Sequence, residues 1–226
     1  RRCGIMSLHH RLRCISAASV APAPTFVGVA SNSGASSASV TPHASTIAND
    51  LLIGIFHFKD TDNTYSVTWP SGFTQIFNKI VNSGAGRSII ALATKLATGS
   101  DGAQSFSWSG YSNAGVAIVT VRGQLASNPI TAFGANIDAA TAASIALSSI
   151  SPAKPALLLG FANGFDASKT WAPPGSMTEL YDFSAGSTGG LRCTAAHETV
   201  AAGATGSRTF TFSSSDDLSG ILVAVE

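Results

Sequence analysis

Short motifs in the first half of this chain return about a hundred residues later, in the same order and at nearly constant spacing. The paired motifs are residues 51–54 and 157–160, 69–73 and 171–177, 105–108 and 209–212, and 118–121 and 222–225. Their starting positions differ by 102 to 106 residues throughout. Agreement in order and spacing along the chain is the signature of a repeated supersecondary unit. We therefore expect two pseudo-repeats, residues 25–124 and 125–226.

Each pseudo-repeat has the pattern of short β-strands separated by turns. Residues 50–58 form a nearly continuous apolar run, which is typical of a strand buried on both faces. Residues 104–109 alternate hydroxyl and aromatic side chains, which is the period of a strand with one buried face. Residues 87–96 are also compatible with a helix, because Ala, Leu and Lys favour one, but their counterpart 190–199 lacks a helical period. We expect strands in all of these segments.

The spacing of the predicted strands favours an all-β fold. Clusters of Gly, Asn, Asp, Ser and Pro interrupt the chain at about the 8–12-residue spacing of sandwiches and barrels. Residues 122–129, between the pseudo-repeats, are too few for a flexible linker. We expect one jelly-roll-like, double-sheet β-sandwich over residues 25–226, built from the two pseudo-repeated halves. Two tandem sandwiches of immunoglobulin size are the alternative.

The first 24 residues differ from the rest of the chain in charge and pattern. They contain four of the 13 basic residues and no acidic ones, which leaves nine basic and twelve acidic side chains, a net charge of −3, in residues 25–226. Residues 15–24 are small and apolar, and their prolines exclude a helix. We expect an extended N-terminal arm, residues 1–24, that packs on a neighbouring copy; a solvated tail is the alternative. The candidate contact residues of the arm are Ile15, Val20, Pro22 and Pro24.

The composition also bears on partners. Charged residues make up only 11% of the chain, about half the usual share. A surface with few charges has little electrostatic protection against association, so assembly with copies of the same chain is expected. Nucleic-acid binding is not expected, because the body has no basic face interleaved with aromatic residues. No stretch approaches the ~18 apolar residues that a membrane-spanning helix needs.

The sequence offers no set of residues for catalysis, a cofactor or a metal. The five histidines lack metal-ligand spacing and an acidic partner at such spacing. Asp60, Asp62 and Asn63 can offer oxygens to a hard cation, but they lack the Gly and the terminal Glu of a calcium loop, and a turn is favoured. Nucleophile elbows, phosphate loops and dinucleotide fingerprints are absent from the sequence. We expect neither an enzyme nor a cofactor or metal site.

Three cysteines, Cys3, Cys14 and Cys193, are too few and too widely spaced for a disulfide scaffold or a zinc module. Three unpaired thiols are favoured. A bridge between Cys3 and Cys14 is the alternative.

Four aromatic residues near the predicted loops are candidates for stacking on sugars. They are Tyr65, Trp69, Tyr111 and Trp171. Packing in the core or on turns is the simpler interpretation of the same residues. Binding of surface glycans is therefore a second expectation, after self-assembly.

The motifs of the body resemble those of a β-sandwich family found in bacteriophage virion proteins and bacterial surface proteins. The matching segments are residues 49–53, 69–76, 107–111, 114–119, 122–123, 128–130, 173–181 and 202–208. They cover the body and leave the arm unexplained, and Phe73 stands where that family more often has Trp. The resemblance implies structural or attachment roles, such as tail, fibre, decoration or filament subunits.

Together these features predict a non-catalytic structural subunit that self-assembles through the arm, in an extracellular filament or on a virion surface. A carbohydrate- or receptor-binding module is the alternative, and a hydrolase on a sandwich scaffold is a more remote one. The expected partners are copies of the same chain and, in the alternative, surface glycans.

Overall fold

The computed structural model describes residues 21–60, 65–77, 87–110, 114–137, 141–186 and 190–226. Every regular element in these residues is a β-strand, which confirms the expected all-β class. No described segment forms a helix long and apolar enough to cross a membrane.

Each half of the chain contributes eight strands. Those of the first half are β1 (Thr25–Gly34), β2 (Ser37–Val40), β3 (Leu51–Asp60), β4 (Ser66–Thr68), β5 (Thr74–Phe77), β6 (Arg87–Leu96), β7 (Gln104–Ser109) and β8 (Ala114–Arg122). Those of the second half are β9 (Ile130–Ile137), β10 (Ala142–Leu147), β11 (Ala156–Gly164), β12 (Trp171–Ala172), β13 (Thr178–Ala185), β14 (Leu191–Val200), β15 (Arg208–Asp216) and β16 (Leu218–Val225).

The strands pair antiparallel into four sheets, and the second half has the strand order of the first. In the first half the orders are β1-β8-β3-β6-β5 and β2-β7-β4. In the second half they are β9-β16-β11-β14-β13 and β10-β15-β12, the same orders with each strand number raised by eight. Each half therefore has one five-stranded and one three-stranded sheet.

Two irregularities of strand pairing recur at equivalent positions of the halves. The register of β1 on β8 shifts just after Phe26, and that of β9 on β16 shifts just after Ile130, 104 residues later. The register of β5 on β6 shifts just after Gln75, and that of β13 on β14 shifts just after Glu179, again 104 residues later. An extra residue in an edge strand bends it, so both five-stranded sheets bend at the same places.

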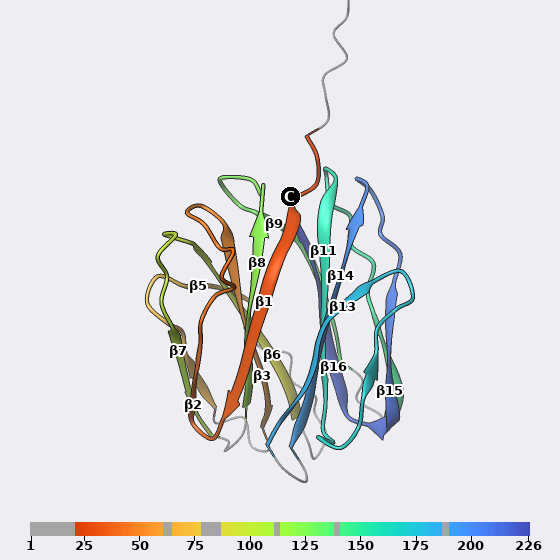
Figure 1. Cartoon of the computed structure of the whole chain (residues 1–226). Coiled ribbons are helices and arrows are strands. Elements are labelled where there is room, and N and C mark those ends of the chain that lie inside the picture. The colour runs from red at the N-terminus through yellow and green to blue at the C-terminus, as the bar shows by residue number, and fades with distance from the viewer. Residues whose placement is uncertain (1–20, 61–64, 78–86, 111–113, 138–140, 187–189) are drawn as a thin grey trace, which may run out of the picture.

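The sheets stack as four layers (Figure 1). The two five-stranded sheets stand face to face in the centre, where β14 contacts β3, and β11 and β16 contact β6. The three-stranded sheets cover their outer faces, β2-β7-β4 on the first and β10-β15-β12 on the second. The fold differs from the expected single pair of sheets, because each half forms a pair of its own and the two larger sheets cover each other.

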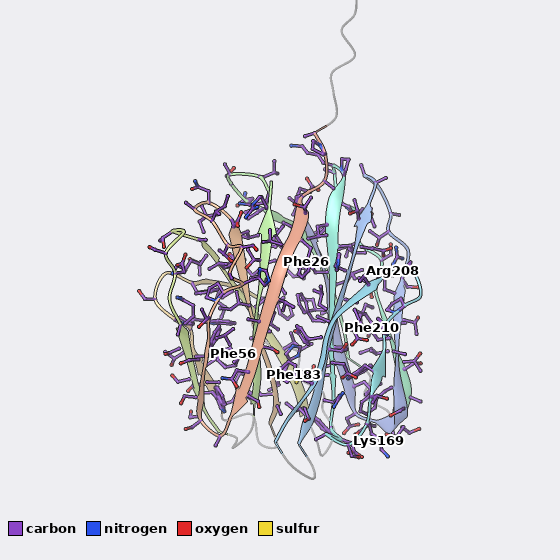
Figure 2. The ribbon with its side chains drawn as sticks, in the orientation of Figure 1. Phe26, Phe56, Lys169, Phe183, Arg208 and Phe210 are labelled. Atoms are coloured by element: carbon purple, nitrogen blue, oxygen red, sulfur yellow. The ribbon has the colours of Figure 1, made fainter. Side chains whose placement is uncertain are left out.

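Large aromatic side chains occupy all three interfaces between these layers (Figure 2). Phe56 of β3 packs on Phe106 of β7 in the first half, with ring centroids 5.3 Å apart. Phe210 of β15 lies against Gly160 of β11 in the second half, and Phe183 of β13 lies between the five-stranded sheets. A strand covered on both faces needs apolar side chains on both, which is why β8 and β11 are apolar runs rather than alternating strands.

Polar side chains cross the interface between the five-stranded sheets. Nε2 of His57, on β3, lies 2.8 Å from the hydroxyl of Tyr181, on β13. Asn163, on β11, donates to the Ile89 carbonyl of the other half at 3.4 Å and accepts a hydrogen bond from Ser219. Burial lowers the pKa of His57 from 6.5 to about 3, so the ring is neutral at neutral pH.

The N-terminal segment meets the body at one end of the layers. Pro24 is buried beside the start of β1, whereas Ala21 and Pro22 are exposed. Residues 21–24 rise from the end of the body rather than running along its side (Figure 1). Of the predicted arm residues, Pro22 and Pro24 are thus placed, and Ile15 and Val20 lie outside the described residues.

Candidate functional site

A pocket of about 360 Å³ opens at the end of the first half, where β3 begins and where β6 and β8 end. We call it the end pocket. Its principal lining residues are Ile47, Asn49, Asp50, Leu96, Arg122 and Gln124. Ile47 and Leu96 are 54% and 46% exposed, which is unusual for large apolar side chains of the described residues. Apolar side chains that line a hollow at the surface are typical of a binding site.

The loop that carries Ile47 is held in place by the carboxylate of Asp50. Arg122 donates Nε to Oδ1 at 2.8 Å and Nη2 to Oδ2 at 2.7 Å, and the Ile47 N–H donates to Oδ2 at 2.9 Å. Arg122 Nη2 also donates to the Ser45 carbonyl. Burial alone would raise the pKa of Asp50, but the hydrogen bonds from Arg122 and Ile47 hold it below its ordinary value. The charged carboxylate therefore fixes the loop at neutral pH.

The side-chain amide of Gln124, a residue of the pocket lining, is hydrogen-bonded through its nitrogen only. Its Nε2 donates to the Asn49 carbonyl at 2.7 Å, which orients the amide. Its Oε1 is buried, and no donor among the described residues reaches it. Buried polar atoms normally have a hydrogen-bond partner. Because this oxygen has almost no solvent-accessible surface, a molecule in the pocket does not reach it without a movement of the Gln124 side chain.

A second hollow of about 340 Å³ adjoins the end pocket. The two hollows share Leu96 and Ala126, and the second is also lined by Leu51 and Pro129. Apolar surface therefore continues from the end pocket toward the junction between the halves.

The N-terminal segment joins the body at the rim of the end pocket. Gly123 lines the pocket and has a φ of 83°, a conformation that favours glycine. The Cα of Pro24 lies 3.9 Å from the position that a Cβ on Gly123 would take. The residues before Pro24 therefore leave the body next to the pocket.

Two of the predicted sugar-stacking residues belong to the outer core layers of the two halves. Trp171 is buried, and its ring centroid lies 4.6 Å from that of Phe212. Trp69 is half-buried, and its ring centroid lies 5.0 Å from that of Phe56. Each tryptophan packs between the five-stranded and three-stranded sheets of its own half, so the structure does not bring the two together at one surface.

The two predicted tyrosines add no shared surface. Tyr65 is half-buried, and its ring packs edge-on against Phe58 with the centroids 4.6 Å apart. Tyr111 lies outside the described residues. Packing is thus the observed environment of Tyr65, Trp69 and Trp171.

Sequence reasoning missed the end pocket. Its signal is a difference between the two halves. Leu51 of the first half pairs with Leu96, whereas Leu157 of the second half pairs with Thr199. The residue before each of these two leucines differs as well, because Asp50 precedes Leu51 whereas an alanine precedes Leu157. A side chain that one half has and the other lacks is a candidate for a function of that half.

Metal and thiol chemistry have few candidates in the described part of the chain. No three His, Cys, Asp or Glu side chains of these residues gather as a metal site would require. Cys193 is a free thiol buried in β14, and burial raises its pKa. Cys3 and Cys14 lie outside the described residues, as do Asp62 and Asn63.

Comparisons with protein-family models, with curated proteins and with solved structures found no match to this chain. The function is therefore proposed from the fold, the end pocket and the N-terminal segment.

Proposed function

We propose that this chain is a non-catalytic structural subunit that assembles with copies of itself through its N-terminal arm, in an extracellular filament or a virion structure. The observation that supports this proposal is the fixed position of Pro24, where the arm joins the body. Pro24 is buried while Pro22 is exposed, so residues 21–24 leave the body from a fixed point at one end. An extended segment that starts from a fixed point can add main-chain and side-chain contacts to a neighbour.

The charges of the arm and the body support association between copies. The arm has four arginines and no acidic residue, whereas residues 25–226 have a net charge of −3. Opposite charges on two copies attract each other over about the Debye length of roughly 8–10 Å at physiological salt. This screened attraction is weak, so in this proposal apolar arm residues such as Ile15 and Val20 provide most of the binding free energy.

The strand order supports a jelly roll in each half and an origin of the chain by duplication. Strands β1 to β4 alternate between the larger and the smaller sheet, and β7 and β8 return to lie between them. A jelly roll has eight strands in total, arranged as two Greek keys, and it recurs in viral capsid proteins and lectins. The recurrence of the order and of both bulges in the second half supports duplication. The fold agrees with the resemblance to virion and surface proteins, but the proposed role is argued from the arm.

The test compares the full chain with a full-length Ile15→Asp/Val20→Asp variant, by light scattering and negative-stain electron microscopy. We expect the full chain to form multimers of its 22.9 kDa mass and the variant to lose them, because a carboxylate is costly to bury in an apolar contact. An Ala201→Asp/Ala204→Asp variant, changed at two exposed residues of the second half, controls for the added charge. A full-length chain that remains monomeric at high concentration would contradict the proposal.

A further inference from the structure

We infer that the end pocket of one copy accepts residues 15–20 of the N-terminal arm of a second copy. This inference rests on the proposed function, because it names the surface on which the arm docks. Two features of the pocket support it: its exposed apolar side chains and its position beside the base of the arm.

The apolar side chains of the pocket match the character of the arm. Ile47 and Leu96 present about half of their surfaces to solvent on a backbone that Asp50 and Arg122 hold in place. Four of the six residues 15–20 are apolar and two are serines, with a branched aliphatic side chain at each end. Contact between the two removes apolar surface of both copies from water. Because the pocket is preformed, binding orders only the arm.

The direction of the segment favours the arm of a second copy over the chain's own arm. Residues 21–24 point away from the end of the body (Figure 1), and Pro22 and Pro24 restrict this stretch to extended backbone. Ile15 precedes Pro24 by nine residues, which span up to about 30 Å when extended. A second copy that faces this end therefore lies within reach.

The position of the pocket sets the symmetry of the contact. The arm starts at the same end of the molecule as the pocket. Two copies that meet at these ends can therefore each place an arm in the end pocket of the other. A reciprocal contact of this kind is closed and joins two copies. The second half lacks the equivalent of Leu96, because Thr199 replaces it there. A filament built on such pairs uses a further contact along the body.

The test changes the pocket and leaves the arm intact. The full-length variant Ile47→Ala/Leu96→Thr installs the residues that the second half has at equivalent positions, Ala153 and Thr199. Both replaced side chains are about half exposed, so the fold is retained. Phe133→Ser, which removes another exposed apolar side chain at 51% exposure, is the matched control. Sedimentation equilibrium measures the mass and dissociation constant of the pair.

We expect a pair for the full chain and for Phe133→Ser, and association weakened at least tenfold by Ile47→Ala/Leu96→Thr. If the pair survives the pocket change but is lost in Ile15→Asp/Val20→Asp, the arm docks elsewhere, which overturns this inference and leaves the proposed function standing. If the unchanged full-length chain is monomeric at all concentrations, the proposed function fails and the inference fails with it.

Discussion

Equivalent loops of the two halves are held by carboxylates that come from different positions in the sequence. In the first half the N–H of Ile47 donates to Asp50, which follows it in the same loop and is bound by Arg122. In the second half the equivalent N–H, that of Ala153, donates to Oε1 of Glu226 at 2.6 Å. Glu226 occupies the position of Arg122, 104 residues later. The loop anchor is therefore kept while its source changes, and in the first half the anchoring carboxylate forms an ion pair beside the end pocket.

The central strands differ in a similar way. His57 pairs in register with Gly115 of β8, whereas its counterpart Asn163 pairs with Ser219 of β16. Ser219 donates to the Asn163 Oδ1 at 2.9 Å, whereas His57 hydrogen-bonds across the interface to Tyr181 of the opposite half. The same strand framework thus accepts different polar contacts. Exchanging residues between equivalent positions tests which of these contacts depend on their half.

The largest effect is expected from Gly115→Ser, which installs the residue of the second half. A Cβ on Gly115 would lie 2.8 Å from the Cys193 Sγ and 3.0 Å from the Phe183 ring, so the side chain has no room. Overpacking of this kind costs typically 1–3 kcal/mol, and we expect a loss of about 3 kcal/mol in urea unfolding. Ser219→Gly, the reverse change, should cost about 1 kcal/mol through a lost hydrogen bond. Equal effects of the two changes would show that the halves pack alike here.

The next effect is expected from Asp50→Ala, again the residue found in the second half. It removes the acceptor for Arg122 and for the Ile47 N–H, and we expect a loss of roughly 2 kcal/mol in unfolding free energy. The pocket loop should also exchange its amide hydrogens faster, whereas the loop at Ala153, anchored by Glu226, should not change. Unchanged exchange at Ile47 would mean that Asp50 does not fix the loop.

A smaller, pH-dependent effect is expected at His57. Its pKa is about 3 in the folded protein and about 6.5 when unfolded, so below pH 6.5 the unfolded state binds the extra proton. Stability from the neutral ring is complete above pH 6.5 and falls as the pH drops, by about 1 kcal/mol between pH 6.5 and 5.5. His57→Asn, which copies Asn163, should remove this part of the slope. The same slope in the variant would assign it to another group, such as His197, whose pKa burial also lowers.

The smallest effect concerns a reversed ion pair. Lys95 pairs with Asp101 at 2.8 Å in the first half, whereas Glu198 pairs with Arg208 in the second. Lys95→Glu copies the second half and sets two carboxylates against each other. Ion pairs near the surface contribute roughly 0–1 kcal/mol, so we expect a loss of about 1 kcal/mol that shrinks with added salt. A salt-independent loss would point to packing of the Lys95 stem instead.

The sequence predicted the elements better than their layering. Residues 87–96 were expected as a strand because their counterpart lacks a helical period, and β6 spans Arg87–Leu96. Residues 104–109 form β7, with Phe106 and Trp108 buried as the alternation predicted. The four layers were not predicted, because periodicity tells which side chains are buried and not which sheet covers them.

The end pocket could not be read from local patterns. Its loop depends on a bond between Asp50 and Arg122, which are 72 residues apart in the chain. Similarly, an aromatic residue next to a predicted turn, such as Trp171, looks the same in sequence whether it packs inward or faces solvent. Comparison of the two copies is the sequence signal that finds the pocket, since Asp50 and Leu96 have no equivalents in the second half.

The most direct measurement is disulfide cross-linking between two different chains. One chain has Ala17→Cys in the arm, the other has Ala126→Cys at the end pocket, and both have Cys3→Ser and Cys14→Ser, while Cys193 is buried. On oxidation of the mixture we expect a covalent dimer of one chain of each kind. A partner chain with Ala202→Cys, at an exposed residue of the second half, should give none. If the covalent dimer forms equally with both partners, or forms with neither, docking of the arm in a neighbour's end pocket is contradicted.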